Sequence, residues 1–129
     1  MKFAVTEGDP AGIGPEIVAR ALAEKYEAEF EVLPTGTPCP GRPSAETGRA
    51  ALGAIDRAID LALAGKVDGI VTAPVWKQHI HRAGIPFTGH TEHIAARAGV
   101  KAPTMFHVSD KLRVSIVTTH VSIRKLAST

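Results

Sequence analysis

The sequence predicts an α/β fold in which a mostly parallel sheet is flanked by helices. Short apolar runs that read as strands alternate with longer segments that read as helices. Three loops rich in hydrogen-bonding groups, residues 8–16, 89–99 and 117–122, are each expected just after a strand, where α/β proteins bind ligands. The length of 129 residues fits one α/β domain of ordinary size, residues 1–129.

The composition is that of an ordered globular protein, because 44% of the residues are hydrophobic and 22% are charged. The net charge of +2 is too small, and the basic residues too dispersed, to indicate nucleic-acid binding. A single cysteine, Cys39, excludes an intrachain disulfide and fits a reducing compartment. No signal peptide or bilayer-spanning apolar segment is recognisable, so we expect a cytoplasmic protein with no membrane partner.

The first site candidate is a glycine-rich turn. Residues 2–6 read as a short buried strand, and the turn GDPAGIGPE follows it, with Pro15 suited to the first turn of a helix. In one interpretation, backbone N–H groups around Gly8, Gly12 and Gly14 receive an anionic or polar ligand. In the other, the turn merely requires glycine, since its spacing matches neither the dinucleotide-binding fingerprint nor a P-loop.

The middle of the chain predicts a strand, a loop and the clearest helix. Residues 30–33 read as a strand, and residues 34–43 are a loop rich in proline and glycine. Residues 44–65 read as a helix with Ser44 as its N-cap and Gly65 as its end, because apolar residues recur there at helical spacing. We interpret this helix as structural.

A strand over residues 67–73 ends at Pro74, and Thr72 is a candidate cap for a helix over about 75–83. Lys77 lies in the first turns of that helix and either attracts an anionic substrate or cofactor or is a solvated lysine. His79 and His81 are two residues apart on the helix, so they cannot face one metal together, and we expect both at the surface.

The segment GHTEHIAARAG, residues 89–99, crowds a histidine, a hydroxyl, a carboxylate and a second histidine into the start of a helix that Gly99 closes. His90 and Thr91 are therefore candidate site residues. Alternatively, Thr91 is the N-cap and His90 is one satisfied histidine. His90 and His93 could share a helix face, so a metal site with His120 is conceivable.

Two further strands are predicted over residues 103–107 and 112–118, joined by a turn near Ser109 and Asp110. His120 comes just after the second strand. A histidine after a buried β-branched strand is well held, so it is either a metal ligand or general base, or a capping or core residue.

Together these segments resemble the 4-hydroxythreonine-4-phosphate dehydrogenase family of vitamin B6 biosynthesis. The turn GDPAGIGPE is also similar to the GDGIGPE turn of isopropylmalate and isocitrate dehydrogenases. This similarity implies that the chain has part of the fold of those dehydrogenases. The resemblance is carried by five segments distributed over residues 4–123: AVTEGDPAGIGPEI (4–17), SAETGRAAL (44–52), VDGIVTAPVWK (67–77), AGIPFTGHTEHIA (83–95) and LRVSIVTTHVSI (112–123).

The resemblance implies an NAD-dependent oxidation of 4-phosphohydroxy-L-threonine followed by decarboxylation, with a divalent metal (zinc, magnesium or cobalt) as Lewis acid. The family motifs place substrate binding on His90 and Thr91 and a metal ligand on His120. Lys77 matches the lysine of the family's TxPxxK segment and is a candidate catalytic residue. Gly8, Gly12 and Gly14 fall on the cofactor side. The family also implies a homodimer.

The sequence departs from the family in length. The segment before Ser44 is abbreviated, and the family's segments beyond the match at Ile123, which carry two further metal histidines and the residues for the substrate phosphate, have no counterpart here. One protein ligand seldom holds a catalytic metal. This predicts a family fragment with an exposed apolar face that promotes self-association.

Other functions stay open at this point. The chain could be a non-catalytic binding or interaction module that keeps half of the site, or a dehydrogenase for another phosphorylated hydroxy acid. A metallohydrolase using His90, His93 and His120 would require these side chains to converge on one metal.

Overall fold

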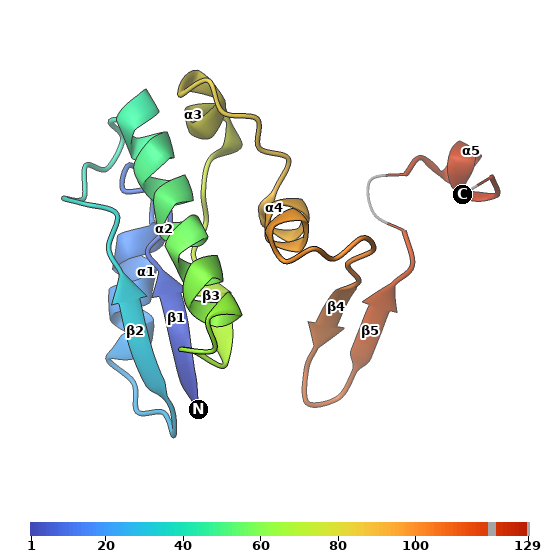
Figure 1. The fold of residues 1–129 in the computed structure, drawn as a ribbon, viewed down its shortest axis with the longest axis horizontal. Helices are drawn as coiled ribbons and strands as arrows, with labels where there is room; N and C mark the ends of the chain where they lie inside the picture. The colour runs from blue at the N-terminus through green and yellow to red at the C-terminus, as the bar shows by residue number, and fades with distance from the viewer. Residues whose placement is uncertain (119–120, 129) are drawn as a thin grey trace.

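The structure, a computed structural model, describes residues 1–118 and 121–128 (Figure 1). Its elements combine a small parallel sheet with a separate hairpin. In chain order they are β1 (Lys2–Thr6), α1 (Gly14–Leu22), β2 (Glu29–Leu33), α2 (Ala45–Leu63), β3 (Gly69–Thr72), α3 (Lys77–Arg82), α4 (His90–Arg97), β4 (Met105–Val108), β5 (Arg113–Ile116) and α5 (Ile123–Leu126).

The sheet has the order β2-β1-β3, and both pairings are parallel. Successive residues of β1 point to opposite faces, and each face has its own helix. Ala4 packs with the α2 residues Ala54 and Ala58 on one face, whereas Val5 packs with Val18 of α1 on the other. Figure 1 shows α1 and α2 on opposite sides of the three strands. The predicted parallel sheet flanked by helices is confirmed.

Helix α2 is the central packing element, as its periodicity predicts. Ser44 caps it through a reciprocal pair of hydrogen bonds with Thr47, in which each side-chain oxygen accepts from the other residue's backbone N–H at 3.2 Å. Small residues at the sheet face let the helix approach the strands closely. Ile55 and Ile59 then fill the space between α2 and α3, with exposed fractions of 0% and 1%.

Two helix starts differ from the expectation. The helix expected from about residue 75 begins at Lys77, and Thr72 does not cap it, because Thr72 is still paired with Thr6 in the sheet. The helix of residues 89–99 begins at His90 with Gly89 as the N-cap, so the prediction of Thr91 as N-cap is wrong. The C-terminal end of this helix agrees with the expectation that Gly99 closes it. Gly99 has a φ of +71°, and the N–H groups of Gly99 and Val100 reach back to the carbonyls of Ala96 and Ala95.

The approach to His90 also differs from the expectation. The three loops were each expected just after a strand, but residues 83–89 form an irregular connection between α3 and α4. The loop of residues 8–16 does follow β1, and the segment after residue 116 follows β5. Only the first of these strands belongs to the parallel sheet.

Strands β4 and β5 pair antiparallel with each other in a second sheet of their own. A turn closes them, in which Ser109 N–H donates to the Leu112 carbonyl at 2.8 Å. The expected buried strand before His120 is wrong as to burial, because Val114 of β5 is 40% exposed and Val117 is 96% exposed. Among the described residues, no helix is long and apolar enough to cross a membrane.

Candidate active site

Lys77, Gly89 and His90 meet where the irregular connection enters α4. A Cβ added to Gly89 would lie 3.5 Å from the Lys77 ammonium nitrogen and 2.7 Å from Oε2 of Glu92. The absence of a side chain at Gly89 therefore leaves room for one cation and one carboxylate beside His90. Thr91, the next residue, lies in the first turn of α4 and is half-buried. Three predicted site residues, Lys77, His90 and Thr91, thus lie at one place.

The surroundings of His90 suit an imidazole that binds a ligand. Its ring meets Phe87 edge-on with centroids 5.9 Å apart, and its Nε2 is buried without a hydrogen-bond partner among the described residues. Burial lowers the pKa of His90 below its ordinary value of 6.5, and the nearby charges of His93 and Lys77 lower it further. The imidazole is therefore neutral near pH 7, and its unpaired Nε2 can hydrogen-bond to a substrate.

His93, unlike His90, has a hydrogen-bonding partner for its Nε2. Its Nε2 lies 2.7 Å from Asp56 Oδ1 on α2, and Arg97 donates to the same oxygen at 2.9 Å. Arg97 also bonds Asp60, one turn further along α2. These contacts hold α4 against α2 and occupy His93 in a structural role.

The residues described do not form a metal site. Within residues 1–118 and 121–128, no group of three or more His, Cys, Asp or Glu side chains is placed to hold an ion. His120 lies outside the described residues, so its role as a metal ligand stays a prediction. The engagement of His93 by Asp56 counts against the site built from His90, His93 and His120. No step that depends on a metal can be derived from these residues.

The glycine turn is tightly packed against the rest of the chain. Gly8 has a φ of +74°, and a Cβ there would lie 2.3 Å from the Pro74 carbonyl oxygen. A Cβ on Gly14 would lie 2.0 Å from the Glu7 carbonyl oxygen. These close contacts are sufficient to explain why positions 8 and 14 are glycine, and no bound ligand is needed to explain them. Gly12 is exposed and borders a cavity of about 220 Å³ with Trp76 and His79, so it is the glycine best placed to face a cofactor. The cofactor role of all three stays a prediction.

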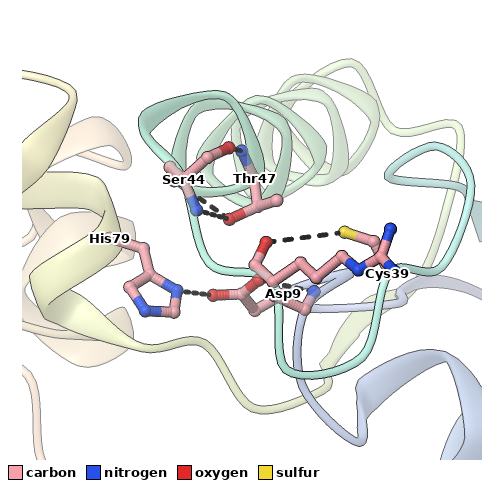
Figure 2. A network of polar contacts seen from close by, with 7 residues as sticks. Asp9, Cys39, Ser44, Thr47 and His79 are labelled. Atoms are coloured by element: carbon pink, nitrogen blue, oxygen red, sulfur yellow. Dashed lines mark hydrogen bonds and ion pairs between the residues drawn. The ribbon is translucent and has the colours of Figure 1, made fainter.

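A buried Asp–His pair is the feature that the sequence did not reveal (Figure 2). His79 was expected at the surface, but it is only 3% exposed, and its Nδ1 lies 2.5 Å from Oδ2 of Asp9. The prediction for His79 is therefore wrong, whereas His81 is exposed as expected. The available signal was Asp9 itself, because a carboxylate in the tight turn after a buried strand needs a partner if it is buried too.

Comparison with known proteins identifies the family. A sequence profile described as pyridoxal phosphate biosynthetic protein PdxA matches residues 8–129. The chain belongs to this family. The PdxA assignment agrees with the resemblance carried by the GDPAGIGPE and GIPFTGHTE segments.

Curated relatives and solved structures agree with the PdxA assignment. The 4-hydroxythreonine-4-phosphate dehydrogenase of Acidithiobacillus ferrooxidans is 43% identical over 98% of this chain and 51% of its own length. The enzyme of the same name from Burkholderia vietnamiensis is 34% identical over 99% of this chain and 51% of its own length. The crystal structure of the Klebsiella pneumoniae dehydrogenase superposes with a TM-score of 0.85 at 31% identity, covering 99% of this chain and 53% of that one.

The chain spans about half the length of the curated relatives that it matches. The alignment with the Acidithiobacillus protein runs over 169 positions, although this chain has 129 residues, so the relative has additional residues inside the matched region. This agrees with the abbreviated segment that the sequence predicts.

Proposed function

We propose that the chain carries the substrate-binding part of a 4-hydroxythreonine-4-phosphate dehydrogenase. The reaction is the NAD-dependent, metal-dependent oxidation of 4-phosphohydroxy-L-threonine, with decarboxylation, in pyridoxal phosphate biosynthesis. The observation that supports it best is the buried, unpartnered Nε2 of His90, at the start of α4 and near the charge of Lys77. Both residues lie within the span that matches the PdxA family. NAD, when bound, accepts the hydride.

The described residues would bind and orient the substrate. The ammonium of Lys77 attracts an anionic group of a phosphorylated amino acid. The neutral His90 hydrogen-bonds a substrate hydroxyl through Nε2 without adding a second positive charge. Thr91 adds a hydroxyl from the first turn of α4, whose N-terminal end favours negative charge. Lys77 as a catalytic group, rather than a binding one, belongs to the same proposal.

A non-catalytic binding module is the second candidate. The site itself favours it, because the described residues around His90 offer an unpaired imidazole nitrogen and an ammonium group, which are groups that bind a ligand. Another phosphorylated hydroxy acid would fit the same half-site, because Lys77 and His90 recognise groups that such compounds share. A homodimer, as the family resemblance implies, completes the proposal and is testable by sedimentation.

Two measurements on the purified chain test the proposal. Formation of NADH, followed by absorbance with 4-phosphohydroxy-L-threonine, NAD and a divalent metal, tests catalysis, with His120→Ala as the variant that should abolish it. Calorimetric titration with the same substrate tests binding.

For binding, His90→Ala should weaken affinity about threefold to tenfold, the loss expected for one hydrogen bond between neutral groups. The matched control is His107→Ala, because His107 is exposed on β4. Binding without turnover favours the module. A folded chain that neither binds nor turns over the substrate refutes both candidates.

A further inference from the structure

Asp9 and His79 form a buried pair that the proposed chemistry does not use. Their exposed fractions are 2% and 3%. Oδ2 of Asp9 accepts from Nδ1 of His79 at 2.5 Å, and Oδ1 accepts from the backbone N–H of Ala11 at 2.9 Å. This hydrogen bond places the donor proton on Nδ1 of the imidazole. Both oxygens of a costly buried carboxylate are thus satisfied.

The pair joins the glycine turn to the segment that carries Lys77. Asp9 follows β1, and its backbone N–H donates to the Pro74 carbonyl at 3.0 Å. His79 lies on α3, two residues after Lys77. Asp9 therefore binds the chain on both sides of Lys77, once through its backbone and once through its carboxylate.

Helix α3 needs such an anchor. It has only six residues, and no side chain caps its N-terminus. Isolated helices of this length are unstable in water, so tertiary contacts must fix where α3 begins. Lys77 is the first residue of α3, and its position follows from that start.

We propose that Asp9 and His79 are a positioning pair that fixes the start of α3 and thereby directs Lys77 toward His90. The proposed role of the pair is exerted through Lys77, although Asp9 and His79 also line the cavity beside Gly12. The inference rests on the proposed function of Lys77 and His90 as substrate-binding residues. It assigns His79, which the sequence does not mark as functional, to the organisation of the site.

The competing explanation is packing alone. The ring of Trp76 lies against the His79 ring with centroids 4.7 Å apart, and Gly48 of α2 approaches the His79 backbone. These contacts depend on shape and would survive replacement of His79 by an apolar residue of similar size. The hydrogen bond to Asp9 would not, so the two explanations predict different variant behaviour.

The test is a double-mutant cycle on the full chain, read by calorimetric titration with 4-phosphohydroxy-L-threonine. His79→Leu removes the donor, His79→Asn keeps an N–H near the position of Nδ1, and Lys77→Met removes the charge. The matched control is Gln78→Leu, because Gln78 is the exposed residue between them. Circular dichroism verifies that each variant is folded.

His79→Leu should weaken binding about tenfold, as for loss of one hydrogen bond to a charged group, and His79→Asn should restore most of it. His79→Leu combined with Lys77→Met should bind no more weakly than Lys77→Met alone, because the first residue acts through the second. Additive losses, or unchanged binding in His79→Leu, would overturn the proposal in favour of packing.

A second readout separates this inference from the proposed function. If the wild-type chain does not bind the substrate, the acylation rate of Lys77 is measured by mass spectrometry, with the exposed Lys111 as internal reference. His79→Leu should change the acylation rate of Lys77 by more than about threefold, which exceeds the usual scatter between variants. Gln78→Leu and His79→Asn should change the rate by less than this. An unchanged Lys77 rate in His79→Leu would refute the positioning role, whatever the chain binds.

Discussion

The parallel-sheet unit and the β4–β5 hairpin are built from similar sequence but differ in burial. In the sheet unit, Ala4 of β1 and Ile55 of α2 are completely buried. In the hairpin, Phe106, Val108 and Val114 are 56%, 64% and 40% exposed. Figure 1 shows the hairpin beside the sheet unit, joined to it through α4.

The difference shows what local sequence determines and what it does not. β-branched and aromatic runs produce strands in both regions, because strand propensity acts on neighbouring residues. Burial requires a second layer, which α2 provides for the sheet. Among the described residues, the principal contacts of the hairpin are between its own two strands. An exposed apolar surface of this kind favours association with another surface, as the sequence predicts.

The largest expected effect comes from a cavity in the sheet unit. Ile55→Ala removes a side chain of 0% exposure between α2 and α3 and should lower the free energy of unfolding by about 2–5 kcal/mol. Val108→Ala in the hairpin should change it by less than about 0.5 kcal/mol, because that side chain is already largely in water. Urea unfolding measures both. Equal losses would mean that the hairpin is buried in solution, and the contrast between the regions would fail.

The site shows the same limit of local reasoning. The glycine turn, the capped helix and the GHTEH segment are recognisable because their signals lie within a few consecutive residues. The pairing of Asp9 with His79 joins residues 70 positions apart, and nothing in the spacing of either indicates it. The irregular approach to His90 was equally hidden, because no local pattern distinguishes it from the end of a strand. The free Nε2 of His90 depends on tertiary burial as well.

A close approach within the sheet unit gives the next effect. A Cβ at Gly48 would lie 2.3 Å from the backbone of His79, so Gly48→Ala should destabilise by about 1–3 kcal/mol despite the better helix propensity of alanine. A Cβ at Gly53, on the same helix, would have Nη1 of the Arg57 side chain as its nearest neighbour, at 3.8 Å, so Gly53→Ala should stabilise by up to about 1 kcal/mol. Thermal unfolding of the Gly48→Ala and Gly53→Ala variants measures both changes in stability. A stabilising Gly48→Ala would show that α2 and α3 are not in close contact.

The link between the two regions should have an intermediate effect. Asp56 binds both His93 and Arg97 of α4, so Asp56→Ala should cost about 1 kcal/mol and loosen α4 from α2. Asp60 also contacts Arg97 but is 63% exposed, so Asp60→Ala should cost less than about 0.5 kcal/mol. Amide hydrogen exchange in α4 would report the loosening directly. Similar exchange rates in the two variants would show that contacts other than those of Asp56 hold α4 against α2.

The smallest effect concerns two histidines, His90 at the start of α4 and His107 in the hairpin. The folded protein lowers the pKa of His90 below 6.5, chiefly through burial, so the unfolded chain binds this proton more readily. The stability that His90 contributes is therefore complete above about pH 6.5 and is lost as the pH falls through its folded-state pKa. His90→Gln should remove that part of the decline in stability between pH 7.5 and pH 5, measured by urea unfolding at each pH. His107→Gln, exposed on β4, should leave the decline unchanged. If both variants keep the wild-type decline, His90 is as accessible to water as the hairpin residue, and its neutral, unpaired nitrogen cannot be the basis of substrate recognition.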